Sequence, residues 1–332
     1  MRPLFALLGT AWLFLGLVLE LVLANPALAQ QNVEFPNRAV RLVVPFPPGG
    51  PTDVCARIVG QKLSELWGQP VVIENRPGAD TAIGAQAVAR AEPNGHTLLV
   101  AVDSTLTVNP LIRADLPYNP GEDFASIALL FKNTTLLTVK SDGPATAKEL
   151  IAKARANPGK LNYGAGIPAN RLAASLFIER ANIDVQYIPF KGGSDLVAGL
   201  LNRSLDFAVD SAAASLPAIQ AGNLRALAKI STSVSLPSLP DLQSLSVAAD
   251  MPLLEDITSW GALVAPRATP QPIIDKLRND VRRAYSDPVV IEKLGNAGIG
   301  VTTSTPAELD AFLSQERHRW QSAIESGKIK LN

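Results

Sequence analysis

Residues 43–53 read Val-Val-Pro-Phe-Pro-Pro-Gly-Gly-Pro-Thr-Asp and join an apolar run to the start of a helix. Gly49 and Gly50 lack side chains, so another molecule can approach the backbone closely there. Pro51 suits the first helical position, where its missing N–H would have no intrahelical acceptor. The free N–H groups and partial positive charge of a helix N-terminus attract anions. This stretch therefore predicts main-chain binding of a small anion.

A second stretch of this kind runs from Ile188 to Asp195, where Gly192 and Gly193 again separate an apolar run from a helix start. A tight turn explains either loop alone, but two such loops in different parts of the chain favour binding. A phosphate site is not favoured, because neither a GxxxxGK(S/T) run nor a GxGxxG run follows a strand. Asp53, three residues past Gly50, would also repel a dianion.

Polar residues directly follow other apolar runs. Asp103, Ser104 and Thr105 follow residues 97–102, and Asp210 ends a further run. In an open α/β sheet the ligand lies at the carboxyl ends of the strands, so these residues are expected at that edge. Serine and threonine hydroxyls there can both donate and accept hydrogen bonds.

No residue pattern predicts catalysis or a metal or cofactor site. The two histidines are His96, at a turn, and His318, on a polar helix, and both are interpreted as surface residues. Neither stands near a G-x-S-x-G or HExxH motif, and Cys55, the one cysteine, lies on an apolar helix face as a predicted buried thiol. The protein is predicted not to be an enzyme; an exported α/β hydrolase or lyase is the enzyme alternative.

Charge and the N-terminus limit the partners and the location. Lysine plus arginine and aspartate plus glutamate both number 30, so no basic excess predicts nucleic-acid binding. Residues 1–29 resemble a signal peptide: Arg2 precedes an apolar run, and Ala27-x-Ala29 predicts cleavage after Ala29 and export to the periplasm. A retained N-terminal anchor is the alternative, because the run is long and contains Glu20.

From residue 38 onward, short β-rich runs alternate with amphipathic helical patterns, which predicts an α/β fold with mixed sheets flanked by helices. The expected strands are 40–46, 70–74, 97–102, 127–131, 136–140, 161–164, 185–189, 206–210, 226–230 and 260–265. The expected helices are 53–67, 79–91, 146–156, 170–181, 194–202 and 213–221, with a nearly all-helical tail over 270–326. We expect one domain from 30–131 plus 258–332 and a second, inserted domain from 132–257, with a ligand cleft between them that can close.

Several motifs then occur together and in order along the chain. They are Arg41–Asp53, Asn75–Ala79, Pro93–Leu99, Asn157–Tyr163, Pro189–Gly192, Ala221–Ala228 and Ser259-Trp260. With these motifs the chain resembles the Bug-type solute receptors of tripartite tricarboxylate transporters. The resemblance implies a type II-like periplasmic-binding-protein fold and a monomer that binds a small carboxylated molecule and delivers it to membrane permease subunits. The contacts it implies are Gly49, Gly50, Thr52, Asp53, Ser104, Thr105, Ala165, Gly192 and Asp210.

Some positions depart from the family pattern. Asp80-Thr81-Ala82 stands where Gly-Gly-Asn is usual, Asn170-Arg171 replaces a common Ser-His, and Asp103 adds an acid. Asp80 and Asp103 would meet a cationic end of the ligand, while Arg171 would clamp a carboxylate. The hypothesis is a zwitterionic or nitrogen-bearing acid; alternatively these charges pair with each other or face solvent. The alternative receptor function is that of a sensor, which presents its ligand to a membrane histidine kinase.

Overall fold

A computed structural model of the chain describes residues 35–190, 192–230, 236, 238–251 and 258–326. Contacts divide the chain into residues 1–37 and a compact unit of residues 38–332. The predicted signal peptide, residues 1–29, lies outside the described residues.

The first of two sheets has six strands in the order β11-β4-β10-β3-β1-β2. β1 is parallel to β2 and β3, whereas β10 is antiparallel to β3 and β4, and β11 is antiparallel to β4. The strands are β1 (Val40–Val44), β2 (Val71–Asn75), β3 (Thr97–Val102), β4 (Phe124–Asn133), β10 (Trp260–Pro266) and β11 (Ile299–Val301).

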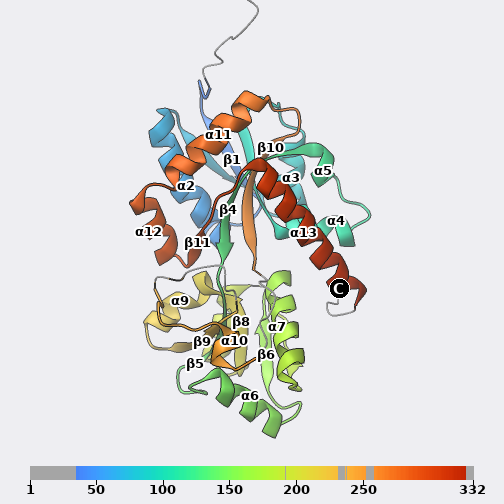
Figure 1. The fold of residues 1–332 in the computed structure, drawn as a ribbon, viewed down its shortest axis with the longest axis vertical. Helices are drawn as coiled ribbons and strands as arrows, with labels where there is room; N and C mark the ends of the chain where they lie inside the picture. Colours follow the sequence, from blue (N-terminus) through green and yellow to red (C-terminus); the bar gives the residue numbers. More distant parts are fainter. Residues whose placement is uncertain (1–34, 191, 231–235, 237, 252–257, 327–332) are drawn as a thin grey trace, which may run out of the picture. The chain divides into compact units, whose positions relative to one another are not determined.

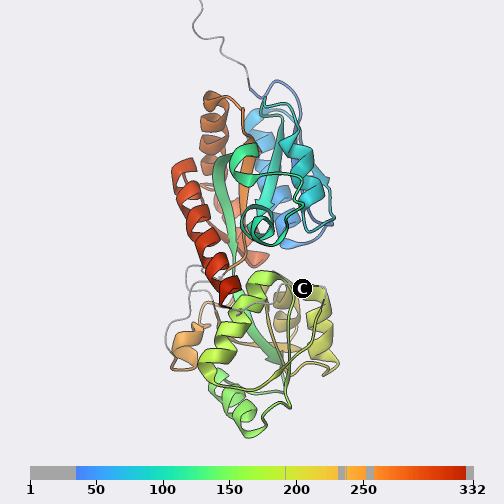
Figure 2. The same cartoon turned by 90° about the vertical axis from the view of Figure 1, so that its right-hand side faces the viewer.

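Helices cover both faces of this sheet, which explains why every residue of β3 and β10 is buried. Alternate residues Val43, Leu99 and Ala101 face a core shared with α3 and α13. α2 and α11 contact each other on the other side, and α13 runs alongside β4 (Figures 1 and 2). The helices are α2 (Pro51–Trp67), α3 (Ala82–Ala89), α4 (Asn109–Ile112), α5 (Pro120–Asp123), α11 (Gln271–Ala284), α12 (Pro288–Asn296) and α13 (Pro306–Glu325).

The second sheet has five strands in the order β7-β6-β8-β5-β9. β6 is parallel to β7 and β8, and β5 is antiparallel to β8 and β9. The elements are β5 (Thr135–Lys140), α6 (Ala147–Ala156), β6 (Asn162–Ala165), α7 (Pro168–Ala181), β7 (Gln186–Tyr187), α8 (Gly193–Leu201), β8 (Phe207–Ser211), α9 (Ala212–Gln220), β9 (Leu224–Lys229) and α10 (Leu245–Ala248). One core joins α6 and α7 to Leu137, Phe207 and Val209, and a separate cluster joins α8 to Ala208.

The two sheets repeat one topology. The run β2-β1-β3-β10-β4 matches β7-β6-β8-β5-β9 in order and in strand direction, so β1 corresponds to β6 and β3 to β8. The chain passes from the first sheet to the second between β4 and β5 and returns at β10. The two connections are hydrogen-bonded to each other, since Asn133 N donates to Ser259 O (2.8 Å) and Asn133 Nδ2 to Ser259 Oγ (2.7 Å).

Several sequence expectations need correction. The nearly all-helical tail also contains β11, a strand of three residues that the sequence did not predict and that forms an edge of the first sheet. The sequence did not predict the helical segment after β3. This segment, Ser104–Val108, has the π conformation and continues into α4. His96 is not a surface residue: only 8% of it is exposed, because it directly precedes β3. His318 is exposed and Cys55 is buried, as predicted.

Candidate functional site

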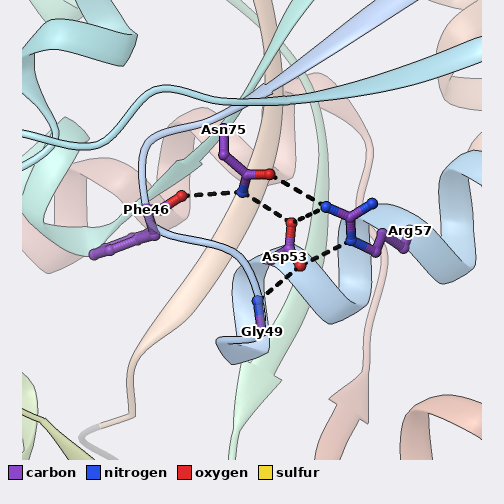
Figure 3. A network of polar contacts seen from close by, with 5 residues as sticks. All are labelled: Phe46, Gly49, Asp53, Arg57 and Asn75. Carbon is purple, nitrogen blue, oxygen red and sulfur yellow. Dashed lines mark hydrogen bonds and ion pairs between the residues drawn. The ribbon is translucent and has the colours of Figure 1, made fainter.

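The loop between β1 and α2 is held by the side chain of Asp53 (Figure 3). Asp53 Oδ2 accepts from Gly49 N (2.9 Å) and from Arg57 Nε (2.8 Å). Its Oδ1 accepts from Arg57 Nη2 (3.0 Å) and from Asn75 Nδ2 (2.9 Å). Asn75 Nδ2 also donates to Phe46 O (3.0 Å), so this network ties both ends of the loop to the end of β2.

This network determines the charge of Asp53. Burial by itself raises the pKa of Asp53, but the hydrogen bonds from Arg57, Gly49 and Asn75 outweigh burial and lower the pKa below its usual value. Because both carboxylate oxygens accept from protein donors, the side chain positions the loop. A ligand at this helix N-terminus would meet the main-chain N–H groups of Thr52 and Asp53, which have no intrahelical acceptor.

The two glycines of this loop serve different needs. Gly49 has φ +94°, a conformation that side chains disfavour, and it directs its N–H to Asp53. Gly50, the N-cap of α2, has φ −78° and ψ 168°, and a Cβ added there would meet no heavy atom within 4 Å. An open approach to the backbone, rather than conformation, is therefore what glycine provides at position 50.

The loop between β2 and α3 has a strained backbone. Ala79, Asp80 and Thr81 have φ of 47°, 52° and 78°, three consecutive left-handed residues of which none is glycine. Hydrogen bonds hold it: Asn109 Nδ2 donates to Asp80 O (2.6 Å), and Thr105 Oγ1 donates to Thr81 Oγ1 (2.9 Å). The side chain of Asp80 is exposed, whereas Thr105 is fully buried.

Asp103, directly after β3, is a buried acid. Its exposed fraction is 5%, its Oδ1 accepts from Ser104 N (2.7 Å), and its Oδ2 has no hydrogen-bond partner among the described residues. Burial, together with the smaller effect of the nearby Glu316, raises the pKa of Asp103 to about 7 against the hydrogen bonds from Ser104. The half-buried Ser104 begins the π-helical segment, a conformation frequent at functional sites.

In the second sheet the predicted residues come from the ends of β6 and β8 and from two helix starts. Ala165 is buried and its carbonyl accepts from Tyr187 Oη (3.2 Å). Asn170, 2% exposed in the first turn of α7, accepts from Thr135 Oγ1 (3.4 Å). Arg171 follows it, half-buried, and its buried Nε has no hydrogen-bond partner in the described part of the chain.

The structure brings together the Gly192–Gly193 loop and Asp210. A Cβ on Gly193 would lie 3.3 Å from Asp210 Oδ2, so the carboxyl group packs against the start of α8. Asp210 Oδ1 accepts from Ser211 N (2.7 Å) and Oδ2 from Ser215 Oγ (3.3 Å). Burial raises the pKa of Asp210 to about 6 against these hydrogen bonds. Ser211 Oγ is buried and lacks a partner within the described residues.

The two double-glycine loops follow strands of different sheets, and these two strands do not hold equivalent positions in the strand order. Gly49 and Gly50 follow β1, an interior strand next to the edge strand β2, whereas Gly192 and Gly193 follow the edge strand β7. The equivalent of the β1–α2 loop is residues 166–167, between β6 and α7, and Asp53 of α2 corresponds to Asn170 of α7. Sequence reasoning did not propose Arg57, Asn75 or Thr81 as site residues, and it placed Ser211 at a strand end without proposing it as a contact. The dipeptide Asp-Ser, which occurs at both 103–104 and 210–211, was a visible signal for Ser211.

Comparison with known proteins identifies the family. The profile described as "Tripartite tricarboxylate transporter family receptor" matches residues 55–329, well over half of the chain. The chain belongs to the family of tripartite tricarboxylate transporter receptors. Among relatives, it is 34% identical to the "UPF0065 protein in tcbD-tcbE intergenic region" of Pseudomonas sp. strain P51, over 99% of this chain and 98% of that one. It is 31% identical to "Protein BugT" of Bordetella pertussis, over 90% of this chain and 91% of that protein.

Solved structures show the same fold. One described as "Structure of a periplasmic transporter" has a TM-score of 0.78 at 35% identity and covers 90% of this chain and 100% of its own. "R. palustris Rpa4515 with adipate" has 0.78 at 29% identity, covering 88% and 98%. "MatC (Rpa3494) from Rhodopseudomonas palustris with bound malate" has 0.72 at 30% identity, covering 87% and 100%. These matches confirm the predicted receptor family and periplasmic-binding-protein fold.

No group of three or more histidine, cysteine, aspartate or glutamate side chains among the described residues could hold a metal ion. Over the same part of the chain, no helix is both long and apolar enough to cross a membrane.

Proposed function

We propose that this receptor captures a small carboxylate-bearing molecule outside the cytoplasm and delivers it to membrane permease subunits of a tripartite tricarboxylate transporter. The proposal rests on one observation. One helix next to each sheet, α2 at the first and α8 at the second, begins at a glycine pair, and these glycines have no side chains to cover its main-chain N–H donors. Gly50 and Gly192 have no heavy atom within 4 Å of an added Cβ. Two solved relatives are described with adipate and with malate, which are both dicarboxylates.

The ligand would lie between two domains. The two sheets are built from residues 40–133 with 260–301 and from residues 135–229, which supports the expected division into 30–131 plus 258–332 and 132–257. A protein whose chain crosses twice between domains can hinge at the crossing. The bonded pair Asn133 and Ser259 is the natural hinge position. The receptor would act in the periplasm as a monomer after cleavage of residues 1–29.

A nitrogen-bearing acid is a second candidate ligand. The exposed Asp80 and the buried Asp103, whose Oδ2 has no hydrogen-bond partner among the described residues, could meet a cationic group, and the half-buried Arg171 could bind a carboxylate. The contact residues proposed for either ligand are Gly49, Gly50, Thr52, Asp53, Asp80, Asp103, Ser104, Thr105, Ala165, Asn170, Arg171, Gly192 and Asp210.

Calorimetry separates these ligands. The mature chain would be titrated with adipate, malate, glutamate and a pyridine carboxylate, after mass spectrometry of any small molecule that copurifies. Tightest binding to adipate or malate supports a plain dicarboxylate, and tightest binding to glutamate or the pyridine acid supports the second candidate. Absence of binding to every acid would overturn the proposed function. A two-protein permease encoded nearby favours transport, whereas a histidine kinase favours the sensor alternative.

A further inference from the structure

Asp103 and Asp210 occupy the same place in the two sheets. β3 and β8 are equivalent strands, each parallel to its neighbour on one side and antiparallel on the other. Asp103-Ser104 comes directly after β3, and Asp210-Ser211 ends β8. The two dipeptides are identical in type and equivalent in position, although the sequence shows no overall repeat.

The carboxyl groups also share one geometry. In each, Oδ1 accepts from the N–H of the following serine at 2.7 Å. The exposed fractions of the residues are 5% for Asp103 and 3% for Asp210. Asp103 Oδ2 has no donor among the described residues, and the donor at Asp210 Oδ2 is the hydroxyl of Ser215 at 3.3 Å. A buried carboxylate with so few donors is held more stably as the neutral acid.

Each acid belongs to a segment that contacts a loop of the proposed binding site. Thr105, two residues after Asp103, bonds to Thr81 of the β2–α3 loop, and Asp210 packs against Gly193 of the β7–α8 loop. These loops follow the equivalent strands β2 and β7. The segments that carry the two acids therefore contact equivalent loops of the two sheets.

Among the described residues, the charged groups around the acids do not offset their burial. Glu316 of α13, 3% exposed, acts on Asp103 in the same direction as burial and is itself bonded to Trp260 Nε1 and paired with Arg319. Asp80 and Asp195, on the adjacent loop and helix start, are exposed. At Asp210 the groups that favour the charged form are the hydrogen bonds from Ser211 and Ser215.

We propose that Asp103 and Asp210 meet the bound ligand as neutral carboxylic acids, so that this receptor takes up protons as it captures its acid. This inference rests on the proposed function and specifies how the same site is regulated by pH. A neutral acid can donate an O–H to a ligand carboxylate, whereas an ionised one repels it.

Linkage gives the expected pH dependence. A bound anion raises the pKa of both acids, so protons are taken up at pH values above the pKa of the free protein. With burial placing these pKa values at about 7 and about 6, affinity is flat below about pH 6 and falls above it. The fall approaches about tenfold per pH unit for each proton taken up.

The test is calorimetry at pH 8 with adipate and with malate as probes, in phosphate and in Tris buffer, whose ionisation enthalpies differ. The wild-type chain is expected to take up between one and two protons per ligand bound. Asp103→Asn and Asp210→Asn keep an oxygen for the serine N–H, and each should lower the uptake by up to one proton and flatten the pH dependence. Asp280→Asn, a control of matched 3% exposure in an acid bonded to Trp67 and Lys276, should leave the uptake unchanged.

Different outcomes overturn different claims. Binding at pH 8 without proton uptake, or uptake that both asparagine variants retain, would overturn the inference and leave the proposed function intact. Proton release would overturn it in favour of a cationic ligand group. No binding of either probe or of any other acid tested would overturn the proposed function and the inference with it. If the variants do not fold, infrared titration of the ligand-free wild-type chain decides: no carboxyl group protonated above pH 6 would contradict the inference.

Discussion

At the residue scale, the side chain of Asp53 positions the β1–α2 loop, and its main-chain N–H is the group proposed to meet the ligand. The sequence singled out Asp53 because it follows the Gly49–Gly50 pair at a helix start. The sequence could not reveal that Arg57 and Asn75 both donate hydrogen bonds to the carboxylate of Asp53. Asn75 lies at the end of β2 and approaches Asp53 through the parallel pairing of β1 with β2. The residue type was predictable, and its partners depended on tertiary structure.

Replacing Asp53 by alanine should destabilise the fold. The change leaves Gly49 N without its acceptor, leaves Asn75 Nδ2 with Phe46 O alone and removes the partner of Arg57, at a cost of about 1–3 kcal/mol in the free energy of unfolding. The matched control is Asp195→Ala, an exposed aspartate in the first turn of α8, where only the helix-dipole contribution of about 0.3–1 kcal/mol is lost. Urea unfolding measures both; equal losses would contradict the positioning role.

Asp53 and Asp103 predict opposite effects of pH on stability. The lowered pKa of Asp53 means that its stabilisation is present above the unfolded pKa and is lost as pH falls through the folded pKa. The raised pKa of Asp103 means that the folded chain binds more protons than the unfolded chain between the usual aspartate pKa of 3.8 and about 7, so stability declines as pH rises across that window.

The stability of Asp103→Asn should therefore change less with pH. Between about pH 4 and 7 the wild-type free energy of unfolding should decline relative to that of the variant, by a few kcal/mol at about 1.4 kcal/mol per pKa unit. Urea unfolding at a series of pH values checks this. A difference between the two proteins that stays constant over the window would show that Asp103 ionises as freely when folded as when unfolded.

At the element scale, the alternation of strands and helices was predicted because both sheets are covered by helices, which makes the strands short apolar runs. β3 was predicted to the residue, since its six residues are all buried and Gly95 and Asp103 bracket it. The short β11 and the π segment after β3 were missed. β11 has three residues, and tertiary contacts rather than local periodicity determine such pieces.

Alanine variants of the neighbouring Gly192 and Gly193 distinguish an effect on helix packing from an effect on ligand access. Gly193→Ala would place a Cβ 2.4 Å from Ala214 Cβ, so α8 and α9 must shift, at a cost of about 1–3 kcal/mol. Gly192→Ala, at φ 175°, would meet nothing within 4 Å and should leave stability unchanged. Thermal unfolding of the two variants measures the difference. Equal melting temperatures would show that α8 does not pack on α9 as described.

At the scale of the whole molecule, the family and fold could be predicted because the motifs lie at loops that the topology requires. The repeated topology of the two sheets could not be predicted, because the equivalent loops have different sequences. Gly49-Gly50 corresponds to residues 166–167, not to the second glycine pair. Internal symmetry survives in strand order and direction after it is lost from the loops. Asp-Ser, at the ends of β3 and β8, is a trace of it that remains in the sequence.

The most direct test of the central claim is the affinity of two glycine variants for the acid that binds wild type most tightly. If main-chain donors at α2 and α8 hold the ligand, Gly50→Ala and Gly192→Ala should each weaken binding by at least about tenfold, or about 1.4 kcal/mol. Melting temperatures should not change, because neither added methyl group meets a heavy atom within 4 Å. Gly121→Ala, with a nearest atom at 3.6 Å on α5, is the control that should change neither. Wild-type affinity in both loop variants would contradict the account.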